Sequence, residues 1–261
     1  MEFRKYQQAI IEEASDVLTN TGLVYLAMEV RTGKTLTSLG ICDKVGAKSV
    51  LFVTKKMAIK DIEADGLMFN PNYALTIINY ESLHKLDAGL KIDTIICDEA
   101  HTMGAFPKPS KRAKQIKELV RKHGCAVILM SGTPTPESFS QMYHQVWSHK
   151  VNPFSQYKNF YAWAKDYVDV KQKMISGNRI NDYSNGLEDK ILEAVQPHMI
   201  SFTQKEAGFK STIKEEVLYV KIDEKTHKMS KVLRQDRVVT GSKEVILADT
   251  GAKLMSKLHQ L

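Results

Sequence analysis

The sequence has few cysteines and no long apolar stretch. Its three cysteines, Cys42, Cys97 and Cys125, are scattered through 261 residues and have apolar neighbours. This placement favours buried, reduced thiols over a disulfide framework or a cysteine-bound metal. No apolar run reaches the roughly 18 residues that a membrane-spanning helix requires, so a membrane is not an expected partner.

The N-terminus lacks the compact apolar run and small-residue cleavage site of a secretory signal peptide. Residues 1–18, MEFRKYQQAIIEEASDVL, have the apolar spacing of an amphipathic helix instead. Together with the reduced cysteines, this indicates a cytoplasmic protein. The hydrophobic fraction of 43% and the charged fraction of 26% are those of an ordinary soluble protein, and the length allows one or two domains.

Acidic residues are outnumbered by basic ones. The formal net charge is +7 and the isoelectric point is near 9.1, which permits nucleic-acid binding without requiring it. The segment 108–124, KPSKRAKQIKELVRKHG, concentrates this excess, and Glu118 is its only acid. It is either a solvated helix face or a surface for nucleic acid, and composition leaves both open.

Short apolar runs alternate with helical patterns up to about residue 147. The runs predict strands at 23–28, 49–54, 73–79, 92–98 and 126–131. Helices are expected between them, including one from Thr35 to about Lys44 that ends before Gly46. Continuous apolar strands linked by helices are typical of a parallel sheet covered on both faces. We therefore expect a doubly wound α/β fold whose ligand site lies at the carboxyl ends of the strands.

The sequence changes character after about residue 147. It becomes aromatic, polar and mostly helical, with a turn-rich stretch at 176–186, a strand predicted at 216–222 and helical sequence beyond it. Four aromatic residues recur at near-helical spacing, which favours a core over a base-stacking surface: Tyr157, Phe160, Tyr161 and Trp163. We expect an α/β lobe over 1–150 and a smaller, mainly helical appendage over 151–261.

The segment LAMEVRTGKTLTSLG, residues 26–40, contains the end of a phosphate-binding loop. The pattern G-x-x-x-x-G-K-[ST] is met at Gly33, Lys34 and Thr35, but Met28 stands where its first glycine is expected. Glycine lets the backbone wrap a phosphate, and the helix that follows offers its positive N-terminus. Lys34 would reach the β- and γ-phosphates of ATP, and Thr35 would hold Mg²⁺. In a chain of this length, G-K-T alone is a weak signal.

Two acids, Asp98 and Glu99, lie at the end of the strand predicted at 92–98. A carboxylate such as Asp98 is costly at the end of a buried strand unless a cation or hydrogen bonds satisfy it, and Mg²⁺ with ATP would do so. Glu99 would then orient the attacking water and accept its proton. The alternative is a helix N-cap, with Asp98 capping and Glu99 beside the helix dipole.

Ser131, Gly132 and Thr133 lie at the end of the strand predicted at 126–131. Taken alone they are turn formers. Their value lies in the order of the three segments, because each of them comes directly after a separate predicted strand.

In that order, these segments resemble the first, RecA-like lobe of superfamily 2 DEAH-box helicases and translocases. Four residues, Asp98-Glu99-Ala100-His101, spell the DEAH box, and the resemblance implies that His101 links the ATP site to the coupling segment Ser131–Thr133. The N-terminal FRKYQQ resembles the Q-motif, which implies that Gln7 reads the adenine edge while Arg4 or Tyr6 packs nearby.

The segment INYESLHKL, residues 78–86, resembles part of the Swi/Snf-type translocases that act on duplex DNA. The resemblance implies DNA as partner, with duplex favoured and single strands possible, and phosphate contacts from two loops: Thr54, Lys55 and Lys56, and Asn79, Tyr80, Glu81 and Ser82. A solvated loop at Lys55–Lys56 and a core position for Tyr80 are the alternatives. Residues 199–209, MISFTQKEAGF, lie where these proteins carry a basic segment, but lack its paired arginines.

The resemblance also bears on the missing glycine. Swi/Snf-like relatives commonly read D-E-M-G-L-G-K-T, so Met28 need not be glycine, and Glu29 is retained. Val30 and Arg31 replace Met and Gly. Arg31 therefore stands where glycine's freedom at positive φ could be used, and points either toward phosphate or into solvent. With Thr32, it belongs to the expected cofactor-binding loop.

The family implies ATP and Mg²⁺ as cofactors and a second RecA-like lobe of the same polypeptide that supplies arginines to the γ-phosphate. The sequence ends where that lobe would begin, so we expect weak turnover by this chain alone. We also expect the protein to be a monomer, to be encoded by a phage and to lie in the cytoplasm of the bacterial host. Two alternatives remain: a non-motor nucleic-acid-binding or recruitment module that uses ATP as a switch, and the motor subunit of a restriction system.

Overall fold

The computed structural model describes residues 2–175, 178–209, 223–240, 245–248 and 251–258. The chain divides into two compact units. The first comprises Met1–Val170 and Tyr183–Lys210, and the second comprises Lys171–Asp182 and Ser211–Leu261. This division does not fall at residue 150, because residues 151–170 pack on the core of the first unit.

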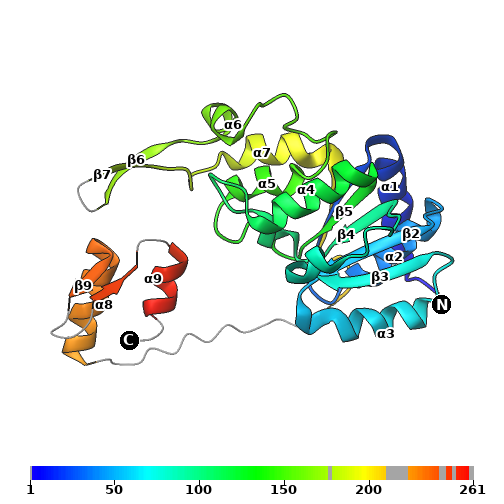
Figure 1. Ribbon diagram of the computed structural model, residues 1–261, viewed down its shortest axis with the longest axis horizontal. Helices are drawn as coiled ribbons and strands as arrows, with labels where there is room; N and C mark the ends of the chain where they lie inside the picture. Colours follow the sequence, from blue (N-terminus) through cyan, green and yellow to red (C-terminus); the bar gives the residue numbers. More distant parts are fainter. Residues whose placement is uncertain (1, 176–177, 210–222, 241–244, 249–250, 259–261) are drawn as a thin grey trace. The chain divides into compact units, whose positions relative to one another are not determined.

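A six-stranded parallel sheet forms the centre of the first unit (Figure 1). Its strands are β1 (Leu23–Met28), β2 (Ser49–Thr54), β3 (Ala74–Asn79), β4 (Thr94–Cys97), β5 (Ala126–Met130) and β8 (Met199–Phe202), in the order β3-β2-β4-β5-β1-β8. The five strands expected from apolar runs are confirmed, and β8 was not expected as a strand. Together with the helices between the strands, this order confirms the α/β, RecA-like fold.

Helices cover both faces of this sheet. The first unit contains α1 (Lys5–Thr21), α2 (Lys34–Lys44), α3 (Ile59–Phe69), α4 (Lys111–His123), α5 (Met142–Val146), α6 (Phe160–Tyr167) and α7 (Glu188–Val195). Its short 3-10 helices are η1 (Lys56–Ala58), η2 (Tyr80–Lys85), η3 (Ala100–Met103), η4 (Phe139–Gln141) and η5 (Gln196–His198). One apolar core joins the sheet to α1, α2 and α3, and the other joins it to α4, α5, α6 and α7. Alternate residues of each strand feed the two cores, as the period of two along a strand requires.

Local signals in the sequence explain several helix ends. Helix α2 ends before Gly46, as expected. Val45 is its C-cap residue, and Gly46 adopts a left-handed φ of 71°. The hydroxyl of Ser110 accepts a hydrogen bond from the backbone N–H of Ala113 and so caps α4. The cations of α4 lie mostly on its solvated side, but Lys117 stacks over the ring of Trp147 at 3.5 Å.

Two further expectations are met in the cores. Cys42, Cys97 and Cys125 are buried and free, as expected for reduced thiols. Phe160 and Trp163 are also buried and Tyr157 is half-buried, whereas Tyr161 is 47% exposed, so the expected aromatic core is met in part. These residues belong to the core of the first unit rather than to an appendage. Among the described helices, none combines the length and apolar character that crossing a membrane demands.

The second unit contains more β-structure than the sequence predicts. Strands β6 (Lys171–Ile175) and β7 (Asn178–Asp182) form an antiparallel hairpin where mainly helical, turn-rich sequence was expected. Helix α8 (Glu224–Asp236) is followed by an antiparallel pair, β9 (Val238–Thr240) and β10 (Val245–Leu247), and by α9 (Gly251–Leu258). The expectation of only helical sequence beyond 222 is therefore wrong, and the strand predicted at 216–222 lies outside the described residues.

Candidate active site

The candidate phosphate-binding loop, residues 29–33, follows β1 and ends where α2 begins. The carbonyl of Glu29 is its main internal acceptor. The hydroxyl of Thr32 donates to this carbonyl at 2.7 Å, and Nζ of Lys34 donates to it at 3.2 Å. Helix α2 begins at Lys34, so its unpaired backbone N–H groups open toward the loop, where they suit an anion.

Left-handed backbone shapes this loop at two positions. Gly33 has a φ of 83° and Arg31 has a φ of 64°, which confirms that the residue in the glycine position adopts positive φ. The side chain of Arg31 is exposed. A side chain at Gly33 would also collide with the amide of Gln7, since an added Cβ would lie 2.6 Å from its Nε2. The loop therefore needs glycine at 33 and tolerates strain at 31.

The N-terminal residues contact the loop from the side of α1. Gln7 is buried, accepts from the backbone N–H of Arg4, and points Nε2 toward Thr37 at 3.3 Å and the carbonyl of Gly33 at 3.4 Å. The hydroxyl of Tyr6 donates to the carbonyl of Thr32 and accepts from Arg4. In this structure the amide of Gln7 therefore holds the loop through Gly33 and the start of α2 through Thr37.

Asp98 lies at the end of β4, beside the end of β2. The hydroxyl of Thr54 donates to Oδ2 of Asp98 at 2.7 Å, and the backbone N–H of Asp98 donates to the carbonyl of Val53. Burial raises the pKa of Asp98, and the charge of Glu99 adds to this, while the bond from Thr54 and the charge of Lys34 oppose it. The N-cap alternative does not hold, because Asp98 caps no helix and pairs with Thr54 instead.

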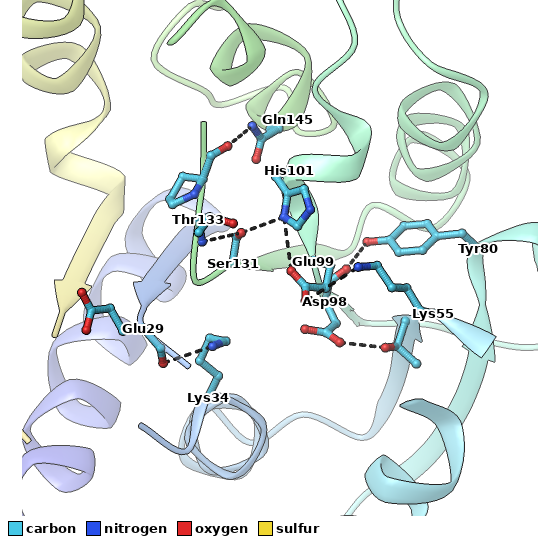
Figure 2. Close-up of polar contacts among 12 residues, drawn as sticks. Glu29, Lys34, Lys55, Tyr80, Asp98, Glu99, His101, Ser131, Thr133 and Gln145 are labelled. Atoms are coloured by element: carbon cyan, nitrogen blue, oxygen red, sulfur yellow. Dashed lines mark hydrogen bonds and ion pairs between the residues drawn. The ribbon is translucent and has the colours of Figure 1, made fainter. Parts of the chain in front are cut away.

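Glu99, His101 and Ser131 form a connected network across the ends of β4 and β5 (Figure 2). Nδ1 of His101 lies 3.2 Å from Oε2 of Glu99 and 2.9 Å from the hydroxyl of Ser131. That hydroxyl also accepts from the backbone N–H of Thr133. Glu99 has a left-handed φ of 49°, so its backbone turns sharply at this point. His101 therefore connects Glu99 to the segment Ser131–Thr133.

Lys34 faces the two acids across the site (Figure 2). Burial lowers the pKa of Lys34, whereas the charges of Asp98 and Glu99 raise it. Burial likewise lowers the pKa of His101, whereas the charge of Glu99 opposes this effect. The residues expected to converge on a triphosphate therefore come together at the carboxyl edge of the sheet.

The residues expected at nucleic acid divide into two groups. Thr54 and Tyr80 are buried, and Tyr80 donates its hydroxyl to the carbonyl of Asp98, so neither contacts a phosphate from outside. Their places at the site come from packing: the ring of Tyr80 lies under the guanidinium of Arg112. Lys55 and Lys56 are exposed, and Nζ of Lys55 lies 3.9 Å from Glu99.

The remaining members of that set lie in the second loop. Asn79 and Ser82 are half-buried, and the amide of Asn79 donates to Glu81 at 3.0 Å. Glu81 also pairs with Arg112. The hydrogen bonds from Arg112, helped by the one from Asn79, lower the pKa of Glu81 to about 2. The loop is therefore tied to α4 through charge.

Two supporting glutamines were missed by sequence reasoning. Gln145 accepts from the hydroxyl of Tyr25 and donates to the carbonyl of Pro134, which fixes the segment after Ser131. Gln204 contacts the phosphate-binding loop from beyond β8. Neither lies in a recognisable motif, and only the register of the strands brings them to the site.

Comparison with known families defines the class of protein. The SNF2-related domain matches residues 53–261, and the chain belongs to this family. The match begins after the phosphate-binding loop, so the family match does not support a role for that loop. Its proposed role depends on its geometry alone. Comparison with curated proteins gave no significant match.

Two solved structures are similar over about half of the chain. One is the ATP-dependent Type ISP restriction-modification enzyme LlaBIII bound to DNA, with 18% identity and a TM-score of 0.39 over 51% of this chain and 13% of that one. The other is a nuclease-deletion mutant of the Type ISP enzyme LlaGI in complex with a DNA substrate mimic, with 17% identity and a TM-score of 0.38 over 52% of this chain and 18% of that one. The chain spans less than a fifth of either, and a likeness of this extent does not define function.

Proposed function

We propose that this chain is the ATP-binding lobe of a DEAH-box, DNA-dependent ATPase that moves along or unwinds DNA. The observation that carries the proposal is the convergence of Lys34, Asp98, Glu99 and His101 at one edge of the sheet, with His101 in contact with Ser131. Membership of the SNF2-related domain family supports it.

The residues present fit ATP with Mg²⁺. Gly33 and the start of α2 form a cradle of N–H groups for phosphate, and Lys34 brings a cation to it. No cluster of three or more metal-binding side chains occurs in the described part of the chain. Mg²⁺ bound with a nucleotide needs only one or two protein ligands beside phosphate oxygens and water, and Thr35 and Asp98 would supply them.

Each side chain then has one task. The bound metal would neutralise charge that develops on the phosphates. Lys34 would leave the carbonyl of Glu29 to bind phosphate oxygens, and Asp98, oriented by Thr54, would hold the metal through its free side. Glu99 would orient a water and take its proton, while His101, in contact with both residues, would pass the state of Glu99 to Ser131. Arg31, Arg4 and Tyr6 line the loop and would contact the nucleotide at its edges.

ATP hydrolysis by the intact protein, with and without duplex DNA, tests this proposal. Glu99→Gln should lower turnover by about 10² to 10⁴ while ATP still binds, because only the proton acceptor is lost. Glu63→Gln, on the exposed side of α3, is the matched control and should change neither. Hydrolysis that persists in Glu99→Gln would contradict the assigned base, and hydrolysis unaffected by DNA would contradict the DNA-dependent part.

The non-motor alternative predicts a different result for the same assay. A module that uses ATP only as a switch would bind nucleotide without DNA-stimulated hydrolysis. The contact of His101 with both Glu99 and Ser131 favours the ATPase, because a binding switch needs no proton acceptor linked to the next strand. A restriction motor would show the same hydrolysis but depend on a nuclease or methylase partner.

A further inference from the structure

The segment Met199–Phe209, which lacks the paired arginines of the resembling family, lies against the phosphate-binding loop. Strand β8 pairs in parallel with β1, so that Phe202 lies opposite Met28. The backbone N–H of Glu29 donates to the carbonyl of Phe202 at 2.9 Å and extends the ladder by one residue. The segments that follow β1 and β8 therefore leave the sheet side by side. The first is the phosphate-binding loop and the second is loop 203–209.

Gln204 bonds to this loop at two points. Its backbone N–H donates to Oε2 of Glu29 at 2.7 Å, and its side-chain Nε2 donates to the carbonyl of Val30 at 2.9 Å. The first bond is charge-assisted, and the second holds the peptide directly before Arg31. The two bonds fix both ends of the Glu29–Val30 pair.

Loop 203–209 is itself ordered by internal hydrogen bonds. Glu206 accepts from the backbone N–H and the hydroxyl of Thr203, which lower its pKa. The backbone N–H of Phe209 donates to the carbonyl of Gln204 at 3.0 Å. Gln204 therefore approaches Glu29 from a closed turn rather than from a loose strand of chain.

Glu29 joins Gln204 to the residue that would bind phosphate. Its carboxylate accepts from Gln204, and its carbonyl accepts from Thr32 and from Nζ of Lys34. A displacement of Glu29 would therefore change the starting position of Lys34.

The departure from glycine explains why such a support is needed. Arg31 adopts positive φ, which is unfavourable for a residue with a side chain and persists only where neighbouring contacts hold it. We propose that Gln204 is a positioning residue for the phosphate-binding loop, which holds Glu29 and Val30 so that Arg31 keeps its left-handed conformation and Lys34 its approach to phosphate. This inference deepens the proposed ATP site and rests on it.

Calorimetric titration of this chain with ATP and Mg²⁺ tests the inference without requiring hydrolysis. Gln204→Ala keeps the backbone bond and loses the bond to Val30, so the Kd should rise about three- to tenfold, the usual effect of one hydrogen bond. Gln204→Glu should raise it more, because a second carboxylate would face the carboxylate of Glu29 and the carbonyl of Val30. Lys205→Ala, exposed on the same loop, is the matched control and should leave the Kd unchanged.

Thermal unfolding without nucleotide separates positioning from a general structural role. We expect the midpoints of both Gln204 variants to stay within a few degrees of the parent, with equal losses for ATP and ADP, since both present phosphates to the loop. An unchanged Kd in Gln204→Ala would overturn the inference while leaving the ATP site standing. A parent chain that binds no ATP would overturn the proposed function together with it.

Discussion

The hydroxyl of Thr54 donates a hydrogen bond to Oδ2 of Asp98 at 2.7 Å, between the ends of neighbouring strands β2 and β4. Thr54 is fully buried, so its side chain faces the proposed metal ligand rather than a nucleic-acid backbone. The bond also lowers the pKa of Asp98 against the effect of burial. Thr54 therefore orients Asp98 and favours its ionised form.

Thr54→Val removes this bond at nearly constant shape. A hydrogen bond to a charged group contributes about 1.5–3 kcal/mol, so the Mg²⁺-dependent part of ATP affinity should fall at least tenfold, and more at mildly acidic pH as Asp98 takes up a proton. Titrations with ATP in Mg²⁺ and in EDTA measure that part. Thr54→Ser keeps the hydroxyl and should retain the affinity. Equal affinities in valine and serine variants would rule out this role.

Two glycines at positive φ give a matched pair for the phosphate-binding loop. An alanine at Gly46 meets no atom within 4 Å, so it should cost only the left-handed strain, about 1–2 kcal/mol in the free energy of unfolding. An alanine at Gly33 adds a collision with Gln7. Gly33→Ala should therefore destabilise the chain more than Gly46→Ala in denaturant titrations and should abolish ATP binding. Equal losses for both variants, with ATP binding intact, would contradict the geometry of the loop.

His144 predicts a pH dependence of stability. It is buried and donates Nδ1–H to the carbonyl of Ala105, and burial lowers its pKa to about 4. The unfolded chain, with a pKa near 6.5, binds a proton between these values that the native chain does not. The free energy of unfolding should therefore fall by up to about 3 kcal/mol as the pH falls from 6.5 toward 4, and this group should have no effect above 6.5.

Denaturant titrations across that range test this dependence. His144→Gln should flatten the slope between pH 6.5 and 4, while His227→Gln, at an exposed position of α8, serves as control. A slope in His144→Gln equal to that of the parent would show that His144 does not take part.

Lys55 and Lys56 remain the exposed cations of the expected nucleic-acid loop. Each phosphate contact changes the slope of log K against log salt by about 0.9 on duplex DNA, so the double alanine variant should lose up to about two units of slope and bind all sequences more weakly. Lys60→Ala, at an exposed position of α3, is the control. Unchanged slopes in both variants would mean that these lysines form only a solvated loop.

The sequence predicts the first unit well because its signals are local. Apolar runs such as 23–28 and 126–131 are buried strands, and the order of three polar segments behind three strands places the site. Strand β8 was not predicted because it has only four residues and lies at the edge of the sheet, beside β1. The hairpin β6–β7 was not predicted because its strands, KQKMI and NRIND, are largely polar and show no apolar face.

The roles of individual side chains depend on register and were harder to predict. Thr54 meets Asp98 because Val53 pairs with Cys97, and Gln204 meets Glu29 because Phe202 pairs with Met28. Such pairings join residues that are distant in the sequence. The resemblance implied adenine for Gln7 and nucleic acid for Thr54, and could not show that Gln7 also bonds to Thr37 or that Thr54 bonds to Asp98.

A crystal structure of this chain with a non-hydrolysable ATP analogue and Mg²⁺ would show whether these residues form an ATP site. We expect the phosphates to lie over Gly33 and the start of α2, bound by Lys34, with the metal between Thr35 and Asp98 and a water next to Glu99. A nucleotide bound elsewhere, or phosphates that contact none of these side chains, would contradict it.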